Sequence, residues 1–253
     1  MYMEYQSFPQ PRNEAIKVWR YMDFAKFIWL LDSHSLFFTR ADKLGDPFEG
    51  SWPKMNVLAR EPFLDGILDE HRESIAKMAK TMQQLTKNWP RYTAVNCWHM
   101  NEHESAAMWK LYLKSDEGIA VQSTYARLKQ SLIDEEAIFL GIVKYIDYET
   151  DSIEPDNLLA PFLHKRKSYE HEREVRAFVV KWPVSDQEKG MDFNKDTIND
   201  GLAIKIDIAT LVERIYVAPT APDWFADLVK NAVIRFGCTF EVEHSRLSEK
   251  PLF

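Results

Sequence analysis

Lys167–Val180, with the sequence KSYEHEREVRAFVV, is the stretch that decides how this chain folds. A charged segment ends there in two carboxylates, Glu172 and Glu174, and an apolar run follows directly. The alternation of side chains from Glu174 onward is typical of an extended strand. A carboxylate at the start of a strand can be held rigidly and still face a cleft, as a catalytic acid or base requires. The stretch therefore predicts a strand with a candidate site at its beginning.

Around this stretch, short strands and helices follow one another without a regular βαβ rhythm, which favours an α+β fold over a doubly wound sheet. The 253 residues are 45% hydrophobic and 28% charged, which suits one large domain with a real core. We expect a flexible N-terminal arm at 1–15 and a single α+β domain at 16–253, with a polar loop insertion near 183–200. The pattern predicts strands at Val18–Tyr21, Ser35–Arg40, Tyr92–His99, Gly118–Gln122, Ile138–Tyr148, Leu202–Ile206, Arg214–Ala218 and Thr239–Glu243, and helices at Phe24–Leu31, Arg60–Lys87, Thr124–Ile133, Leu158–Glu170 and Pro222–Phe236.

The overall charge and the cysteines limit the compartment and the partners. A net charge of −7 argues against broad nucleic-acid binding through a basic surface. The densest basic run, Lys165–Lys167, is interpreted as a solvated helix end. Two cysteines without CxxC spacing fit a reducing cytoplasm, and the N-terminus lacks the pattern of a signal peptide. We expect a soluble cytoplasmic protein without a membrane partner.

A literal HxxEH occurs at His99–His103, the spelling of inverted zinc-protease motifs. Zinc binding by such a motif requires both histidines on one helical face. Here His99 ends an expected strand, and Asn101 with Glu104 resembles a capping box that opens a new helix. The two histidines are therefore not expected to share a face, and we expect no metal.

Other polar features have a structural interpretation beside a functional one. Asp46 and Glu49 lie in a GDPFEG loop that either caps local backbone or contributes polar contacts to the rim of a cleft. Trp109 and Tyr112, three residues apart, can both face inward as core or line a nucleotide pocket. Glu174 can simply pair with Arg176 or with Arg20, since ion pairs are commoner than catalytic acids. No phosphate-binding glycine loop is present.

Five motifs follow one another along the chain: WRYMD at Trp19–Asp23, LFFTRADKLGDPFEG at Leu36–Gly50, VNCWHMNEHESAAMWKLY at Val95–Tyr112, GIAVQS at Gly118–Ser123 and YEHEREVR at Tyr169–Arg176. In these motifs the chain resembles a mainly bacterial family, the domain of unknown function 2971. The resemblance covers about Trp19 to Leu247 in matching order, and His99 stands where that family often has serine.

The order of elements is also similar to that of the ADP-ribosyltransferase superfamily. Arg20 would lie on the first strand, Ser105–Tyr112 on the central helix, and Glu174 at the late strand, with Glu172–Glu174 spelling ExE. This resemblance implies a central mixed or antiparallel split sheet flanked by helices, with NAD as the substrate. It implies catalytic roles for Glu174 and Glu172, and cofactor contacts from Arg20, Tyr21, Arg40, Ser105, Trp109 and Tyr112.

The first hypothesis is therefore an NAD-dependent ADP-ribosyltransferase-like enzyme, acting as a toxin or antiphage effector on an acceptor that the sequence does not name. The second is a non-catalytic module on the same scaffold that binds a nucleotide or a protein, with Glu174 locked in an ion pair and no open cleft around it. The third is a metal-dependent hydrolase that uses His99 and His103. Convergence of Arg20, Tyr112 and Glu174 on one pocket separates the first hypothesis from a scattered arrangement.

Overall fold

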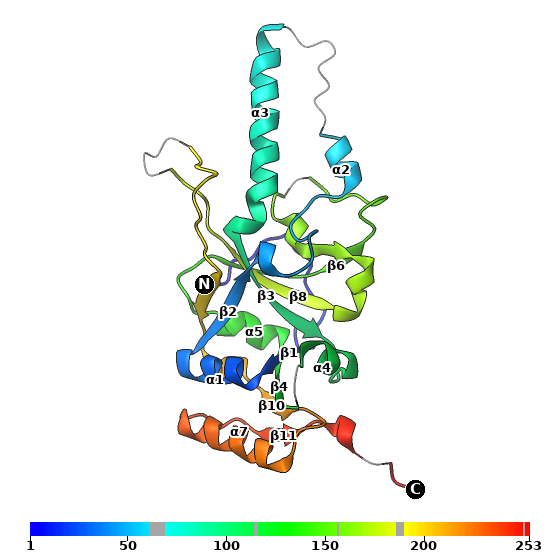
Figure 1. Cartoon of the computed structure of the whole chain (residues 1–253), viewed down its shortest axis with the longest axis vertical. Helices are drawn as coiled ribbons and strands as arrows, with labels where there is room; N and C mark the ends of the chain where they lie inside the picture. Colours follow the sequence, from blue (N-terminus) through cyan, green and yellow to red (C-terminus); the bar gives the residue numbers. More distant parts are fainter. Residues whose placement is uncertain (61–68, 114–115, 156, 186–189, 250) are drawn as a thin grey trace.

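Strand β3 lies at the centre of a large sheet, and the rest of the chain is arranged around it (Figure 1). The structure is a computed structural model that describes residues 1–60, 69–113, 116–155, 157–185, 190–249 and 251–253. With η marking 3-10 helices, the described elements are β1 (Lys17–Asp23), α1 (Phe24–Ser33), β2 (Ser35–Arg40), η1 (Ala41–Lys43), α2 (Lys54–Leu58), α3 (Asp69–Asn88), η2 (Trp89–Tyr92), β3 (Thr93–Met100), α4 (Ala106–Tyr112), β4 (Gly118–Thr124), α5 (Tyr125–Ser131), β5 (Ile138–Ile142), β6 (Lys144–Ile146), η3 (Ala160–Leu163), β7 (His164–Arg166), η4 (Lys167–Glu172), β8 (Glu174–Val180), β9 (Gly201–Lys205), α6 (Ile208–Leu211), β10 (Arg214–Val217), α7 (Asp223–Arg235), β11 (Val242–His244) and η5 (Arg246–Ser248).

The sheet is mixed and is flanked by helices, which confirms the expected α+β class. Within the described residues it has nine strands, with the order β11-β10-β4-β1-β3-β2-β9, while β8 pairs with β3 and β5 with β8. Only β10 and β11 run parallel among the pairs of this described sheet. A separate parallel pair, β6 and β7, lies beside it.

The sheet is split along one edge of β3. On that edge β1 pairs with β3 at His99 and Met100, whereas β2 pairs with it at Ala94 and Val95. Along the opposite edge β8 accompanies β3 from Thr93 to His99. β1 and β2 therefore diverge from β3 on either side of residues 96–98 and leave a gap between them.

Side chains satisfy two of the backbone carbonyls that the split exposes. Arg20 on β1 donates from Nη1 to the carbonyl oxygen of Cys97, at 2.8 Å. Asn96 on β3 donates from Nδ2 to the carbonyl oxygen of Phe37 on β2, at 2.9 Å. Because buried carbonyls need partners, these bonds allow the strands to separate without leaving those two groups unpaired.

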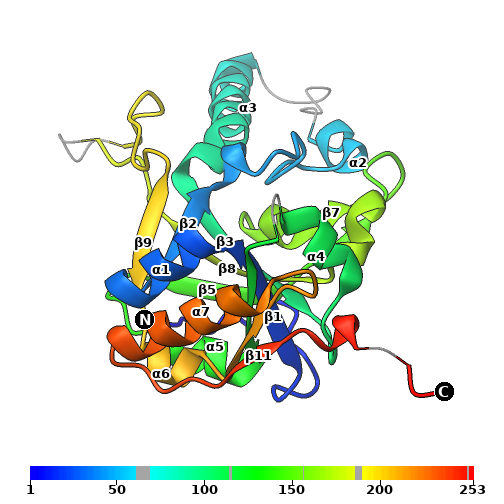
Figure 2. The same ribbon diagram turned by 60° about the horizontal axis from the view of Figure 1, so that its bottom comes forward.

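The two faces of the sheet are covered differently. Helices α1, α5 and α7 lie over one face, as Figure 2 shows, and their apolar side chains form the main core with it. The other face carries two smaller apolar clusters, one around Phe162 and Phe178 and one around Trp19 and Trp109. Since apolar packing is not continuous there, polar groups can occupy the space between the clusters.

Local signals explain the elements that lead into the sheet. Asp23 caps α1, because its carboxylate accepts a hydrogen bond from the backbone N–H of Lys26 at 2.8 Å. Phe27, Leu30 and Leu31 then recur on one face of that helix and are buried. His34 ends the helix in the left-handed region and turns the chain directly into β2.

Three expected elements differ from the observed ones. The single strand predicted at Ile138–Tyr148 is two strands, β5 and β6, which pair in different sheets. The helix predicted at Leu158–Glu170 is wrong, because η3, the strand β7 and η4 follow one another over these residues. Of the predicted helix, only short 3-10 segments are present, and the last of them, η4, ends at Glu172. Part of the helix predicted at Arg60–Lys87 falls on 61–68, outside the described residues, and the described helix α3 is Asp69–Asn88.

The capping box expected at Asn101 and Glu104 is also wrong. Ser105 is the N-cap of α4, and its Oγ accepts from the backbone N–H of Met108 at 3.3 Å. Glu104 instead accepts from Trp109 Nε1 at 3.0 Å and from Ser245 Oγ at 2.6 Å. Its carboxylate thus ties α4 to the C-terminal part of the chain rather than to its own N-terminus.

The N-terminal segment 1–15 contacts the domain at several points. Tyr2 forms a bridge with Ile138, Phe8 is 4% exposed, and Gln10 Nε2 donates to the carbonyl oxygen of Leu140 at 2.9 Å. Its flexibility stays a prediction, as does the polar insertion near 183–200. Among the described helices, none combines the length and the apolar character needed to cross a bilayer.

Candidate functional site

A cleft of about 590 Å³ opens where the sheet is split. Its size lies within the range of small-molecule sites. One wall comes from α1, β2 and η1, the other from α4 and the η4–β8 turn, and β1 and β3 supply residues between them. Figures 1 and 2 both show α1 and α4 on opposite sides of β1. The residues predicted for the site that line this cleft are Arg20, Tyr21, Tyr112, Glu172 and Glu174.

Arg20 supplies a positive charge that no acidic side chain among the described residues neutralises. Its one hydrogen bond is to the Cys97 carbonyl oxygen, and the described residues place no carboxylate in salt-bridge range of it. Burial lowers the pKa of the guanidinium from its usual value, yet an arginine stays charged at any ordinary pH. A desolvated cation of this kind favours an anionic ligand, such as a phosphate group.

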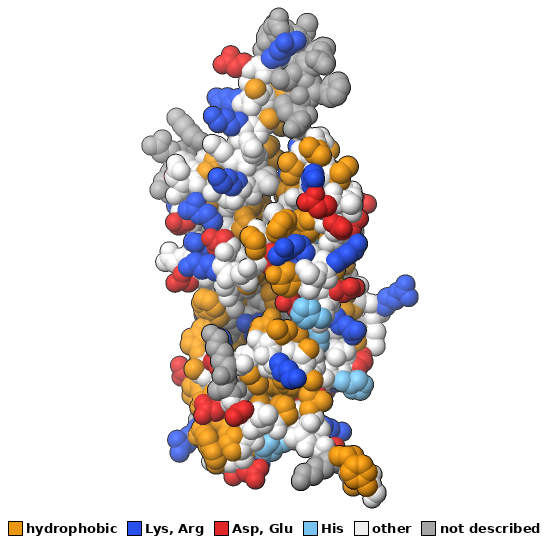
Figure 3. Space-filling model, turned by 45° about the vertical axis from the view of Figure 1, so that its right-hand side comes forward, with side chains coloured by type: hydrophobic (Ala, Val, Ile, Leu, Met, Phe, Trp, Pro, Cys, Tyr) orange, Lys and Arg blue, Asp and Glu red, His pale blue; other side chains and the backbone are white. Residues whose placement is uncertain are grey.

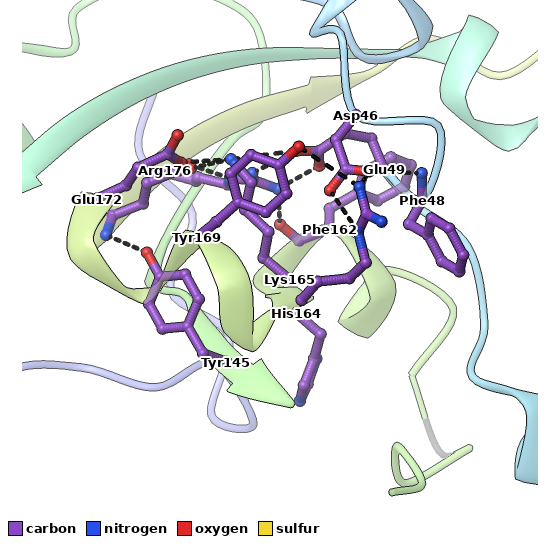
Figure 4. A network of polar contacts seen from close by, with 12 residues as sticks. Asp46, Phe48, Glu49, Tyr145, Phe162, His164, Lys165, Tyr169, Glu172 and Arg176 are labelled. Atoms are coloured by element: carbon purple, nitrogen blue, oxygen red, sulfur yellow. Dashed lines mark hydrogen bonds and ion pairs between the residues drawn. The ribbon is translucent and has the colours of Figure 1, made fainter. Parts of the chain in front are cut away.

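A buried charge cluster surrounds the two carboxylates that line the cleft, and Figure 4 draws its polar contacts. It consists of Glu49, Lys165, Glu172, Glu174 and Arg176. Lys165 Nζ lies 2.5 Å from Glu172 Oε2 and 2.6 Å from Glu174 Oε1. Arg176 donates to Glu174 Oε2 at 2.6 Å, and it donates two hydrogen bonds, of 2.7 and 2.8 Å, to the two carboxylate oxygens of Glu49. Two cations thus face three carboxylates.

Glu174 is held in its ionised form. Burial by itself would raise its pKa, but the charges of Arg176 and Lys165, together with the hydrogen bonds to it, bring the pKa well below its usual value. Its two oxygens each receive one bond from the cluster. The protonated Glu172 carboxyl also bonds Glu174. Once Glu172 ionises, each oxygen of Glu174 keeps one of its two lone-pair sites for a ligand hydroxyl.

Glu172 is the carboxylate that titrates near neutrality. Burial, followed by the adjacent Glu174, raises its pKa from 4.5 to about 7, although Lys165 opposes the shift. Its side chain is 13% exposed, compared with 6% for Glu174. Two neighbouring carboxylates with well-separated pKa values are the arrangement in which one acts as a fixed charge and the other as an acid or base.

The turn that presents both carboxylates is fixed by β3. Arg173 adopts a left-handed conformation with φ of 41°, which ends η4 and starts β8 within one residue. His99 Nδ1 lies 2.7 Å from the carbonyl oxygen of Glu172, and Met100 N–H donates to that of Arg173 at 2.9 Å. Burial lowers the pKa of His99, and because a carbonyl oxygen can only accept, Nδ1 is the donor in this bond. A strained turn held in this way fixes Glu172 in place.

Three residues predicted to contact a cofactor do not line the cleft. Arg40 pairs with Asp42 at 2.7 Å instead. Ser105 caps α4 and donates its N–H to the Tyr21 hydroxyl at 2.8 Å. Trp109 is 2% exposed and packs edge-on against the Tyr21 ring with centroids 4.9 Å apart. The latter two therefore position Tyr21.

Tyr112 and Trp109 divide the two interpretations of their spacing, because Tyr112 lines the cleft and Trp109 is core. Tyr112 is 47% exposed and lies at the end of α4, on the wall of the cleft. The helix thus buries Trp109 and presents Tyr112 to a ligand. A spacing of three residues allows both arrangements, because neighbours at i and i+3 on a helix share only part of a face.

Sequence reasoning missed Lys165 as a member of the site and treated Glu49 only as a rim contact. Lys165 was expected at a solvated helix end, but it lies on β7 and is 8% exposed. Glu49 is 5% exposed and pairs with Arg176 across a long stretch of sequence. The one signal available was the GDPFEG loop, whose Asp46 also pairs with Arg166 at 2.7 Å.

The HxxEH histidines do not form a metal site. His99 is buried on β3 with Nδ1 bonded to a carbonyl, whereas His103 is exposed in the following loop. In the part of the chain that the structure describes, no group of three His, Cys, Asp or Glu side chains is placed to hold a metal ion.

The surface charge is mixed on the face that Figure 3 draws. Basic and acidic side chains are interspersed there rather than gathered by sign.

No protein-family model and no curated protein matches the chain, so its resemblance to the domain of unknown function 2971 stays a prediction. Among solved structures it is similar to DarT of Thermus sp. 2.9 in complex with NAD+, at 8% identity and a TM-score of 0.43, over 95% of this chain and 100% of that one. The same protein in complex with ADP-ribosylated single-stranded DNA matches at 7% identity and a TM-score of 0.43, over 96% and 100%. At these scores the likeness carries no conclusion about activity, and we base the function on the cleft's own residues.

Proposed function

We propose that the cleft binds NAD+ and cleaves its nicotinamide–ribose bond, transferring ADP-ribose to an acceptor. The observation that carries this proposal is that Arg20, Tyr112, Glu172 and Glu174 line one cleft. NAD+ bears an anionic diphosphate and a cationic nicotinamide. The Arg20 guanidinium between the two walls and the carboxylates on one wall match that charge distribution.

The reaction needs a negative charge beside the ribose. When the bond between C1 of the ribose and the ring nitrogen breaks, its electron pair leaves with nicotinamide, and the sugar becomes an oxocarbenium-like cation. Glu174, held ionised by Arg176 and Lys165, stabilises that cation and accepts a ribose hydroxyl bond. A fixed charge of this kind needs no reorganisation as the bond breaks.

Glu172 then handles the proton of the acceptor. The acceptor nucleophile attacks C1 of the ribose and gives up its proton, which the Glu172 carboxylate takes. A pKa of about 7 suits this step, because a base works best when its pKa is near the working pH. Tyr112 borders the nicotinamide, and Arg20 binds the diphosphate.

A binding module without turnover is the second candidate. The ion pairs of Glu174 favour it, because a carboxylate held by two cations is also a common structural feature. The open cleft around Glu174 is evidence against it.

The compartment and the biological role are further parts of the proposal. Both cysteines are free thiols, which supports a reducing cytoplasm. A toxin or antiphage effector is the role that we propose for the enzyme.

Nicotinamide release from NAD+ tests the proposed function. The wild-type protein is expected to release nicotinamide, and Arg20→Met to raise KM at least about tenfold, since one charged hydrogen bond to a phosphate is lost. Arg127→Met is the matched control, because Arg127 also donates to backbone carbonyls but lies on α5. No release by the folded wild-type protein with any acceptor, water included, would contradict the proposal.

The pH dependence of the reaction should follow Glu172. Its ionised form accepts the proton, so the rate is expected to rise from pH 6 to pH 8 with a midpoint near the pKa of about 7. Glu172→Gln should remove this dependence. Because the folded state keeps the Glu172 proton between pH 4.5 and 7 while the unfolded chain loses it, the same group makes the free energy of unfolding fall as pH rises through that window.

Two measurements check this assignment. Rates with saturating NAD+ between pH 5.5 and 8.5 give the midpoint, and thermal unfolding over the same range gives the stability. A flat wild-type profile would show that no proton on Glu172 controls the rate, and an unchanged midpoint in Glu172→Gln would show that another group titrates.

A further inference from the structure

Two large aromatic rings stand exposed on the wall of the cleft opposite the carboxylates. Trp29 on α1 is 38% exposed and Phe37 on β2 is 41% exposed, and both line the cleft. Their centroids are 6.1 Å apart with an angle of 86° between the planes. The two rings therefore form a right-angled corner, which we call the aromatic corner.

The aromatic corner is built into the fold. Phe37 is fixed by β2, where its carbonyl oxygen accepts from Asn96 and its ring lies over Gly201 of β9. A Cβ atom at Gly201 would lie 2.7 Å from Phe37 Cζ, so glycine leaves the space that the ring occupies. Trp29 follows from the helical spacing of α1, whose buried face is formed by Phe27, Leu30 and Leu31.

The wall that carries the aromatic corner also carries positive charge, whereas the opposite wall carries the carboxylates. Lys26 and Lys43 line the cleft on the same wall, and Arg20 lies between the two walls. The pair of Lys26 with Asp23 and that of Lys43 with Asp200 are exposed, and exposed pairs contribute little to stability. Both ammonium groups can therefore turn to a phosphate near the corner.

We propose that the aromatic corner binds the adenine base of the dinucleotide, with the base stacked on one ring and its edge against the other. This inference rests on the proposed function, because it takes NAD+ as the ligand. The cationic nicotinamide belongs beside Glu172 and Glu174, so the ring left for the opposite wall is adenine. Flat rings stack on aromatic side chains irrespective of base identity, and an exposed aromatic pair in a concave site is the surface that such stacking requires.

Two half-ligands separate the corner from the carboxylates. AMP contains adenine without nicotinamide, and nicotinamide mononucleotide contains nicotinamide without adenine. Calorimetric titration of each into Trp29→Ala and Phe37→Ala is expected to show AMP binding weakened roughly 10- to 100-fold, with nicotinamide mononucleotide unchanged within about threefold. In turnover, KM for NAD+ should rise and kcat should stay the same.

Further variants show whether a loss of AMP binding comes from the missing ring or from misfolding of the variant. Trp29→Leu and Phe37→Leu keep apolar bulk but remove the ring, and should show the same loss for AMP. Trp224→Ala, which removes a ring that is 58% exposed on α7 outside the cleft, should change neither ligand.

The possible results distinguish this inference from the proposed function. Equal losses for both half-ligands, or unchanged AMP binding, would overturn the adenine assignment even if nicotinamide release persists. Unchanged AMP binding together with poorer transfer to a nucleobase acceptor would also overturn it and would assign the corner to the acceptor. Selective loss of AMP binding in a protein that never releases nicotinamide would support the adenine site and refute the transferase.

Discussion

Glu174→Gln is expected to lower nicotinamide release from NAD+ by about 10²- to 10³-fold, the effect of removing one preorganised electrostatic group from a transition state. The amide keeps the shape of the side chain but loses the charge that faces the ribose. It also cannot accept from both Lys165 and Arg176 as the carboxylate does at 2.6 Å each. Single-turnover measurement of nicotinamide at saturating NAD+ isolates the step.

The fold should tolerate this change. In the wild-type buried charge cluster, two cations face three carboxylates, so loss of one negative charge leaves two of each sign. Glu213→Gln is a matched control, because Glu213 pairs with Lys17 at 2.5 Å away from the cleft. Release at the wild-type rate by a folded Glu174→Gln protein would exclude Glu174 from the chemistry, and if Glu172→Gln were also fully active, neither carboxylate of the cleft would carry the reaction.

Arg176→Met is expected to lower the free energy of unfolding by about 3–5 kcal/mol, the usual cost of removing one partner from a buried ion pair. The Arg176 side chain is 0% exposed and bonds Glu49, Glu174 and the carbonyl oxygen of Phe162. Its loss leaves Lys165 as the one cation in the cluster for three carboxylates, and Lys165 Nζ is 3.7 Å from Glu49. Denaturant unfolding at pH 7.5 measures the change.

Two further variants show whether uncompensated charge is the cause. Glu49→Gln added to Arg176→Met should recover part of the loss, because it removes one of the stranded charges. Arg214→Met removes an arginine that is 33% exposed and pairs with Glu241 and Glu243, and should cost less than about 1 kcal/mol. If Arg176→Met unfolds at the wild-type denaturant concentration, the buried charge cluster does not stabilise the fold.

The strand that begins at Glu174 could be predicted because its signals are local. Alternation of side chains and two preceding carboxylates are visible in fourteen consecutive residues, and the structure places β8 there. The first helix was equally local, since Asp23 caps it as expected. The split sheet was expected from the order of elements, not from any residue, and the pairing of β1 and β2 with different ends of β3 agrees with it.

The composition of the site depended on contacts that sequence patterns do not report. Lys165 follows a Pro-containing segment and precedes a charged run, which looks helical and exposed, but tertiary pairing makes it part of β7 and buries it. Likewise, Glu49 and Arg176 are 127 residues apart in the chain. Local propensity cannot identify such a pair, because what favours it is the attraction between two buried charges that come together only in the folded chain.

The split has a mechanical consequence for the cleft. β3 is the strand that pairs with β1 at one end and with β2 at the other, so a rotation of one half-sheet against the other must bend β3 between those ends. His99 lies at one of those ends and is the register partner of Glu174. Widening the cleft would therefore shift the Glu174 carboxylate. A ligand that draws the two walls together would, by the same movement of β3, orient the Glu174 carboxylate.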